Sequence, residues 1–201
     1  MEFRIRPALP SEVDVVVEVL TTAFHNDPVS RWVFPDDQRR PAAHRLFFKA
    51  FTEAAFRDGE VYLAGDNIAA ALLFRTYGGE SEDEFMARFS ALKDDELARF
   101  AAVAEVMGAW LEGAKPHLHR QFLGVLPEFQ NTGVGTAIVR DRLAGLDAEG
   151  IPCSLEASTP DSARLYRRLG FLDAGEPFAA PGAPQMFPDR KSTRLNSSHR
   201  P

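Results

Sequence analysis

The chain has 201 residues, of which 45% are apolar and 26% are charged, a composition typical of globular proteins. Its 23 basic and 29 acidic residues give a net charge of -6, which argues against nucleic acid or an anionic membrane surface as the main partner. Cys153 is the only cysteine, so the chain can form neither an internal disulfide nor a cysteine-based zinc site. The N-terminus lacks the apolar run of a signal peptide, and no stretch approaches the roughly 20 apolar residues of a membrane span. We therefore expect a cytoplasmic protein of one domain, without a metal site.

The spacing of apolar residues predicts alternating helices and strands along the chain. The predicted helices cover residues 11–25, 42–57, 82–113, 133–148 and 160–169, and 82–113 is either one helix or two that separate near 93–95. The predicted strands cover residues 3–6, 60–64, 68–75, 122–125, 153–157, 171–175 and 183–187. Residues 31–34 are predicted to form a short aromatic turn.

Helix-start signals refine these boundaries. Ser11 with Asp14 matches a capping box, and Thr159 followed by Pro160 is typical of an N-cap and the first helical position.

The polar, locally basic residues 190–201 show no periodicity, so we predict a disordered tail that derives from cloning sequence. The expected domain therefore spans residues 1–189.

A turn with two glycines, between a strand and a helix, carries the most information about function. The apolar residues 122–125 lead into a polar turn, and Gly133 and Gly135 then open the helix at 133–148. Backbone N–H groups at a helix N-terminus are unpaired and carry partial positive charge. Glycine lets an anionic group approach this main chain closely. The segment therefore predicts a pyrophosphate site built from backbone rather than from lysine.

Two other phosphate-binding patterns fit this segment less well. A P-loop requires Gly-x-x-x-x-Gly-Lys-Ser/Thr, which the chain lacks. A dinucleotide-binding fold is the stronger rival, because Gly133-x-Gly135 opens a helix and Glu156 ends the next strand. However, Ile138 occupies the third glycine position, and the chain that remains is too short for a doubly wound sheet. An NAD(P)-dependent oxidoreductase remains as a minor alternative.

The run Gln130-x-x-Gly133-x-Gly135, preceded by Val125-x-Pro127, resembles the coenzyme A pyrophosphate loop of the GNAT N-acetyltransferases. Downstream, the run from Leu165 to Phe171 resembles the Leu-Tyr-x-x-x-Gly-Phe element of the same superfamily. The similarity extends over nearly the whole chain before the tail. Within the superfamily the chain looks closest to the puromycin N-acetyltransferase-like group, through three short segments: Ala23-Phe24, Asp27-Pro28 and Glu156-Ala157-Ser158.

The resemblance implies an α/β (α+β) GNAT fold, with a mixed, twisted sheet of six to seven strands and helices on both faces. It implies that acetyl-CoA lies where the strand at 120–125 splays from the strand at 152–157. Backbone amides of Gly124 and Val125 would meet the pantetheine and the acetyl carbonyl. The pyrophosphate would be held by a run of main-chain amides and one helix-start side chain, namely Gln130, Asn131, Thr132, Gly133, Val134, Gly135 and Thr136.

The resemblance also implies that Tyr166 donates a proton to the departing coenzyme A sulfur. This is chemically reasonable, because a phenol with a pKa near 10 is protonated at neutral pH and can reach a thiolate whose conjugate acid is near 8.5. Puromycin-type relatives carry an asparagine four residues before the tyrosine, where this chain has Ser162. Whether Ser162 can make the coenzyme contact or the helix cap of that asparagine is therefore left open.

The group that takes the proton of the amine is left open. An amine must be neutral to attack a thioester, so a carboxylate or a histidine should accept its proton. Glu156, at the end of a central strand, is the first candidate, and His117 and His119 come next. Each could equally have a structural role.

Carboxylates and an aromatic side chain lie in the loop region that walls the acceptor pocket in this family, and they suit a cationic amine. They are Asp27, Trp32, Asp36 and Asp37. Ordinary turn residues beside a packed tryptophan explain them equally well. Cys153 is expected to be a buried strand residue and not a nucleophile, since direct transfer needs no acyl-enzyme.

Taken together, the sequence predicts an N-acetyltransferase that moves an acetyl group from acetyl-CoA to the primary amine of a small molecule. An acyl-CoA-binding or sensor domain without turnover is the main alternative. The acceptor is not identified, because loops that form acceptor pockets diverge fastest. A homodimer is an open expectation.

Overall fold

The computed structural model describes residues 3–76, 81–111 and 116–192. Its centre is one seven-stranded sheet with the order β1-β2-β3-β4-β5-β7-β6. All neighbouring strands are antiparallel except β4 and β5, which are parallel. The strands are β1 (Ile5–Pro7), β2 (Gly59–Ala64), β3 (Ala69–Arg75), β4 (Leu118–Val125), β5 (Cys153–Ala157), β6 (Leu172–Asp173) and β7 (Phe187–Lys191).

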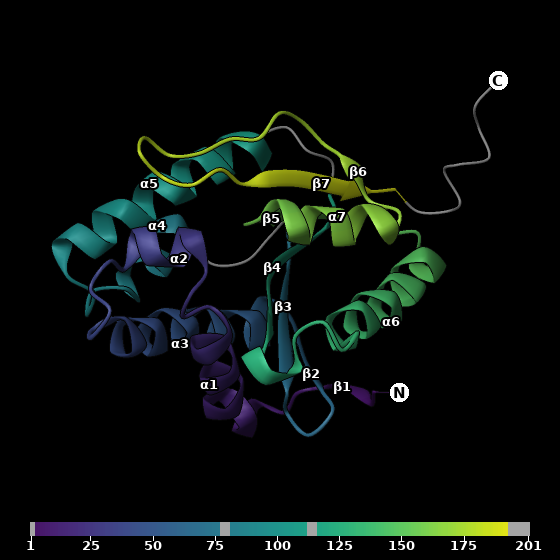
Figure 1. Cartoon of the computed structure of the whole chain (residues 1–201). Coiled ribbons are helices and arrows are strands. Elements are labelled where there is room, and N and C mark those ends of the chain that lie inside the picture. Colours follow the sequence, from purple (N-terminus) through teal and green to yellow (C-terminus); the bar gives the residue numbers. More distant parts are fainter. Residues whose placement is uncertain (1–2, 77–80, 112–115, 193–201) are drawn as a thin grey trace.

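Helices cover both faces of this sheet (Figure 1). They are α1 (Val13–Ala23), α2 (Pro28–Val33), α3 (Arg40–Asp58), α4 (Glu82–Ala87), α5 (Asp94–Leu111), α6 (Val134–Glu149) and α7 (Pro160–Arg168). Two cores result, one beneath α1, α3 and α5 and the other beneath α6 and α7. Strand β3 serves both, because Leu72 joins the first core while Ala71 and Leu73 join the second, as the alternation of a strand requires. The predicted mixed sheet with helices on both faces is confirmed.

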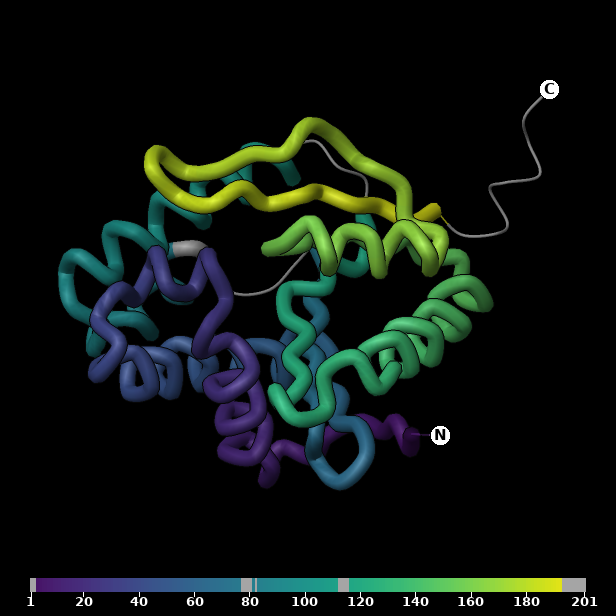
Figure 2. Tube along the Cα trace, in the orientation of Figure 1, coloured from purple at the N-terminus to yellow at the C-terminus, as the bar shows by residue number. Residues whose placement is uncertain are grey.

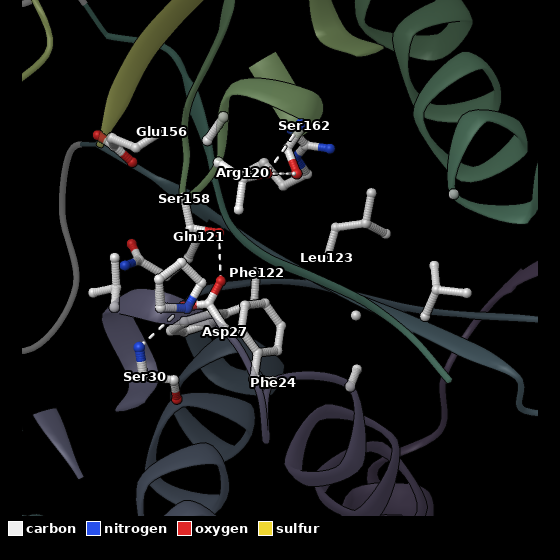
Figure 3. Close-up of a pocket in the computed structure, with 18 of the residues that line it drawn as sticks. Phe24, Asp27, Ser30, Arg120, Gln121, Phe122, Leu123, Glu156, Ser158 and Ser162 are labelled. Atoms are coloured by element: carbon white, nitrogen blue, oxygen red, sulfur yellow. Dashed lines mark hydrogen bonds between the residues drawn. The ribbon is translucent and has the colours of Figure 1, made fainter. Parts of the chain in front are cut away.

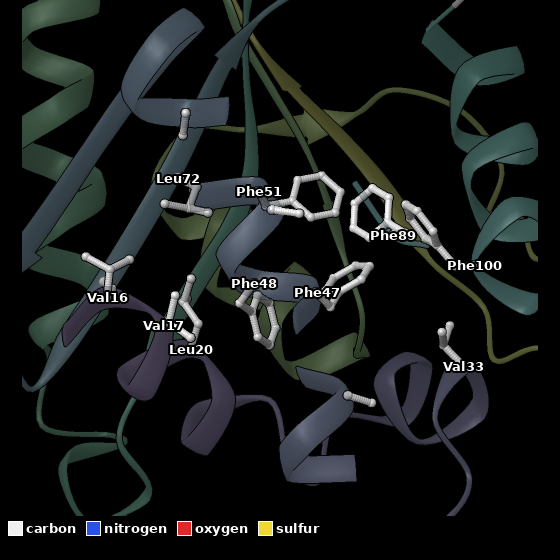
Figure 4. Packing of buried hydrophobic residues seen from close by; sticks show 14 of the residues in the cluster. Val16, Val17, Leu20, Val33, Phe47, Phe48, Phe51, Leu72, Phe89 and Phe100 are labelled. Atoms are coloured by element: carbon white, nitrogen blue, oxygen red, sulfur yellow. The ribbon is translucent and has the colours of Figure 1, made fainter. Parts of the chain in front are cut away.

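The first core is built mainly from phenylalanine rings. Phe47 and Phe51 on α3 meet Phe89 and Phe100 at ring-centroid distances of 5.0 to 6.0 Å, edge to face or tilted, and Phe48 packs edge to face against Phe47 at 5.3 Å (Figure 4). Edge-to-face pairs are a favoured geometry for aromatic rings. The cluster fixes α3 and α5 against the sheet.

The sheet opens at one defined place. Strands β4 and β5 pair only from Leu118 to Arg120, although both strands run further. At the same point the register of β4 against β3 slips, because Leu72 faces Phe122 while Leu73 faces Arg120, which leaves Gln121 as the extra residue of a bulge. A bulge bends its strand and increases the local twist. The rest of β4 therefore diverges from β5, as the resemblance implies.

Three local predictions are wrong. Residues 31–33 belong to the helix α2, with Phe34 as its C-cap, and do not form a turn, because Asp27 accepts a hydrogen bond from the Ser30 N–H at 3.0 Å and caps that helix. The expected capping box of Ser11 and Asp14 does not form. Instead Glu12 accepts from the Leu9 N–H at 2.8 Å, in a short 3₁₀ turn before α1.

The last strand also lies further along the chain than expected. Residues 183–187 were expected to form it, but β7 runs to Lys191 and so includes two residues of the expected disordered tail, Arg190 and Lys191. Their backbone pairs with Ser154 and Cys153 on β5, and the Lys191 Nζ lies 3.2 Å from the Asp147 Oδ1. Backbone pairing with an open strand edge does not need an alternating side-chain pattern, so no sequence pattern indicates that the strand reaches Lys191. Residues 193–201 lie outside the described residues.

His44 makes stability depend on pH. Its ring is fully buried on α3, where the Nε2 lies 2.7 Å from the Ser30 Oγ, and burial lowers its pKa to about 4. Below pH 6.5 the unfolded chain takes up a proton at this residue and the native state does not. The free energy of unfolding should therefore fall as the pH drops from about 6.5 to about 4, by up to about 1.4 kcal/mol per pH unit. Urea titrations should show that His44→Gln reduces this slope; an unchanged slope would contradict the assignment.

Candidate active site

A cavity of about 750 Å³ occupies the opening between β4 and β5. Its walls come from the α1–α2 junction, from the second half of β4, from the start of α6 and from the segment that joins β5 to α7. Part of the phenylalanine cluster reaches it from α3 and α5. Segments far apart in the sequence thus meet at the point where the sheet splays.

The glycine turn forms one end of this cavity. Figure 2 follows the chain from β4 through the turn into α6. Gly133 is the N-cap of α6 with a φ of 95°, a left-handed conformation that favours glycine, and a Cβ placed there would meet no heavy atom within 4 Å. The preceding Asn131 is also left-handed, with a φ of 61°. The unpaired N–H groups of a 16-residue helix therefore face open space, a geometry that suits an anionic group.

Most of the predicted coenzyme-binding residues line the cavity. They are Gly124, Val125, Gln130, Asn131, Gly133, Val134, Gly135 and Thr136. Thr132 is the exception, since it is absent from the lining and its hydroxyl donates to the Phe129 carbonyl at 2.6 Å. Its side chain shapes the turn.

Gly124 has a packing role that the sequence did not reveal. A Cβ at this residue would lie 2.9 Å from the Ala23 Cβ and 3.0 Å from the Leu20 Cδ2. Contacts this short require a shift of one element, so glycine lets α1 approach β4 closely. The residue thereby also sets the position of the α1–α2 wall of the cavity.

Tyr166 lines the cavity from α7 and is 8% exposed. The Arg120 guanidinium carbon lies 4.1 Å from the centre of its ring, a cation–π arrangement. Arg120 is itself 7% exposed, and its Nη1 has no hydrogen-bond partner among the described residues. A positive charge beneath the ring stabilises negative charge that develops on the phenol oxygen.

The start of α7 explains how Ser162 is accommodated. Thr159 caps the helix, because its Oγ1 accepts from the Ser162 N–H at 3.1 Å, as its position in the sequence predicted. The Thr159 hydroxyl also donates to the Ser162 Oγ at 2.9 Å. The serine is therefore part of the helix cap and also lines the cavity.

Glu156 faces the cavity at the end of β5, and polar side chains lie behind it. Its side chain is 5% exposed, its Oε2 lies 3.2 Å from the His119 Nε2, and its Oε1 has no hydrogen-bond partner among the described residues. The Ser154 Oγ lies 2.9 Å from the His119 Nδ1 and 2.6 Å from the His117 Nε2. The two histidines line no part of the cavity, so of the three candidate bases only Glu156 reaches it.

Asp27 is a second buried acid on this cavity. Its Oδ2 accepts a short hydrogen bond from the Ser158 hydroxyl, which joins the α1–α2 junction to the end of β5 (Figure 3). Burial raises the pKa of Asp27, and the hydrogen bond from Ser158 offsets part of this effect. In Figure 3, Asp27 and Ser158 lie together beside Phe122, and Glu156 lies apart from them on the lining of the same cavity.

The other expected wall residues lie elsewhere. Trp32 packs against the first core, and the Asp36 carboxylate accepts from the Gln38 and Arg39 N–H groups at the start of α3. Asp37 pairs with the Arg40 guanidinium at 2.5 Å. These three are turn and packing residues, because their partners come from the α2–α3 connection and the core and not from the cavity.

Cys153 should be chemically inert in the folded protein. Burial raises the pKa of its thiol to about 11, so the reactive thiolate is scarce at neutral pH. We expect Cys153→Ala to retain turnover within about twofold. Intact mass measurements should show iodoacetamide labelling in urea but not in buffer, and rapid labelling of the folded chain would contradict this.

Sequence reasoning missed two features of the site. One is the contact of Asp27 with Ser158, which joins residues distant in the chain and leaves no local pattern. The other is the phenylalanine lining, for which the closely spaced Phe47, Phe48 and Phe51 were a signal but pointed equally well to an ordinary core.

Among the described residues, no group of three or more metal-ligating side chains is gathered, and no helix has the length and hydrophobicity that crossing a bilayer requires.

Residues 87–172 match the family model described as acetyltransferase (GNAT) domain. This segment contains β4, the glycine turn, α6, β5 and α7, and hence Glu156 and Tyr166. The chain is also 35% identical, over 89 residues, to the GCN5-like protein acetyltransferase Rv2170 of Mycobacterium tuberculosis. That alignment covers 43% of this chain and 40% of the relative, so the chain spans well under half of that protein.

Solved structures resemble the whole chain in fold. A histone acetyltransferase HPA2 and related acetyltransferase from Corynebacterium glutamicum gives a TM-score of 0.71 at 22% identity, with 96% of this chain and 97% of that chain covered. The polyamine N-acetyltransferase of Drosophila melanogaster, which forms N-acetylagmatine, gives a TM-score of 0.66 at 15% identity. This alignment covers 95% of this chain and 100% of that chain. At these identities the likeness concerns the fold.

Proposed function

We propose that this chain, which carries a GNAT acetyltransferase domain within the GNAT fold, transfers an acetyl group from acetyl-CoA to the primary amine of a small molecule. One observation supports the proposal most strongly. The glycine turn, the diverging half of β4 and Tyr166 all line a single cavity. The proposed anion site, the free strand edge and the proposed proton donor therefore border one cavity, as acyl transfer requires.

In this proposal the start of α6 binds the pyrophosphate through the N–H groups that follow Gly133. The edge of β4 from Gln121 to Val125 has no strand partner on the β5 side among the described residues, so its main chain can orient the pantetheine and the acetyl carbonyl. When bound, acetyl-CoA supplies the activated acetyl group. The chain contributes position and electrostatic stabilisation.

Two side chains would move protons. Glu156 would take the proton of the amine, since it lines the cavity and its buried Oε1 has no hydrogen-bond partner among the described residues. His119 and, through Ser154, His117 lie behind it in a chain of polar contacts. Tyr166 would protonate the departing thiolate, with Arg120 beneath its ring to stabilise the charge left on the phenol oxygen.

Ligand-dependent thermal unfolding separates this function from its alternatives. A ligand at 100 times its dissociation constant stabilises a protein by about 2.7 kcal/mol, which gives a visible shift. We expect acetyl-CoA and coenzyme A to raise the melting temperature of the chain, and NAD and NADP to leave it unchanged. A response to NAD alone would favour the oxidoreductase alternative and overturn the proposal. Stabilisation by acetyl-CoA with no thiol release for any amine would favour a sensor domain.

Several further points remain predictions. We propose a single domain that extends through the end of β7 at Lys191, a cytoplasmic location and a reaction without metal. A relation to the puromycin N-acetyltransferase-like group rests on three short segments of sequence. Size-exclusion chromatography with light scattering would test the expected homodimer.

A further inference from the structure

The two sides of β4 give the cavity two different linings. On the α6 side are the glycine turn and Tyr166, together with the basic residues Arg120 and Arg168. On the α1, α3 and α5 side the lining is largely aromatic and aliphatic. It includes Phe24, Phe47, Phe51, Phe100, Phe122 and Val103. The second side is where an acceptor would lie, if the first binds acetyl-CoA.

The charges on the acceptor side are all negative. Asp27 and Glu156 line the cavity there, and no lysine or arginine among the described residues lines it on this side. The Glu156 Oε1 is buried without a hydrogen-bond partner in the described part of the chain. A buried carboxylate oxygen of this kind is stabilised by a ligand that donates a hydrogen bond. A substrate ammonium group supplies such donors, whereas a substrate carboxylate would be repelled.

The rest of the acceptor side favours an aromatic group. The Phe122 ring is partly exposed to the cavity, and it packs edge to face against Phe24, Phe48 and Phe51 at centroid distances of 5.7, 5.3 and 5.0 Å. A further ring that enters beside Phe122 can extend this edge-to-face arrangement. A polyhydroxylated group would lose hydration against these rings without gaining a hydrogen-bond partner, and a second cation would gain only a cation–π contact in return for its lost hydration.

We infer that the acceptor is an arylalkylamine, a primary amine whose ammonium group is held by Glu156 and whose uncharged aromatic group lies against Phe122. This inference rests on the proposed function and specifies its substrate. The fold alone does not decide it, because proteins named as arylalkylamine N-acetyltransferases and a polyamine N-acetyltransferase share that fold. The distinction comes from the lining of this cavity.

Competing amines test the inference. With saturating acetyl-CoA, kcat/KM should be at least about 100-fold higher for 2-phenylethylamine than for ethylamine, because the ring is buried. It should fall at least about 100-fold for phenylalanine, which differs only by a carboxylate, and the polyamines agmatine and spermidine should be poor substrates. Preference for a polyamine, or equal turnover of phenylalanine and 2-phenylethylamine, would overturn the inference and leave acetyl transfer standing. No transfer to any amine would instead overturn the proposed function.

A matched pair of variants locates the aromatic subsite. Phe122→Leu should lower kcat/KM for 2-phenylethylamine about tenfold more than it lowers kcat/KM for ethylamine, so the ratio of the two should fall about tenfold. Phe89→Leu is the control, because Phe89 belongs to the same cluster but does not line the cavity. Equal effects of both variants would overturn the subsite. Calorimetric titration of 2-phenylethylamine into each variant with coenzyme A bound gives a readout that does not depend on turnover.

Glu156→Gln tests the ammonium site. It should raise the KM for 2-phenylethylamine more than tenfold while the dissociation constant of acetyl-CoA stays unchanged, since a neutral amide loses the charge-assisted hydrogen bond. An unchanged KM would overturn the assignment of the ammonium site.

Discussion

Tyr166→Phe is expected to lower kcat about 100-fold or more while the dissociation constant of acetyl-CoA stays nearly unchanged. The substitution removes only the hydroxyl, so the ring should keep its place above Arg120 and beside Phe171. A general acid acts on the departing thiolate, and its loss therefore affects the chemical step more than binding. Steady-state kinetics with thiol detection, together with calorimetric titration of acetyl-CoA, would measure both quantities.

Tyr62→Phe is the matched control for the fall in kcat that we expect of Tyr166→Phe. Tyr62 lies on β2, where its hydroxyl donates to the Glu60 Oε2 at 3.2 Å, and it does not line the cavity. Its variant should turn over like the parent chain. Full turnover of Tyr166→Phe at every pH would remove the proposed proton donor from the mechanism.

Gly133→Asp should weaken acetyl-CoA binding far more than Gly133→Asn. Both residues tolerate the left-handed backbone of this position better than other side chains and are good N-caps, so the two variants should share the same helix start. Only aspartate places a negative charge beside the expected pyrophosphate. The repulsion of two unit charges 4 Å apart is about 1 kcal/mol in water and about 4 kcal/mol near a protein surface, which corresponds to about 5-fold to several-hundred-fold in affinity.

Calorimetric titration of acetyl-CoA at low ionic strength measures this difference. Added salt should reduce it, because salt screens exposed charges. The melting temperatures of the two variants should be similar, since neither side chain meets a neighbour within 4 Å of its Cβ. Equal affinities of the two variants for acetyl-CoA would show that the pyrophosphate does not bind at this turn.

The fold was largely predictable because most elements carry strong local signals. The Thr159-Pro160 start of α7 appears where the sequence placed it. The errors lie where a contact distant in sequence decides the structure. Strand β7 is set by the open edge of β5, and α2 forms where Asp27 caps it.

The residues of the candidate site fall into the same two groups, those with a local sequence signal and those placed by contacts distant in sequence. The glycine turn and Tyr166 are local motifs, and the sequence predicted where they would lie. The pairing of Asp27 with Ser158, and the placement of Arg120 beneath Tyr166, depend on the bulge at Gln121 and on the splay of β4 from β5. No spacing in the sequence encodes these contacts, so only the packed structure reveals them.

The central claim is acetyl transfer, and one assay tests it most directly. The chain would be incubated with acetyl-CoA and 2-phenylethylamine, with thiol release followed continuously and the products weighed by mass spectrometry. The account predicts thiol release that depends on the amine, with one N-acetylated amine formed for each thiol released, and a rate about 100-fold lower for Tyr166→Phe. If acetyl-CoA stabilises the chain but no amine in the series above increases thiol release, the site binds the coenzyme without transferring its acetyl group, and the account is contradicted.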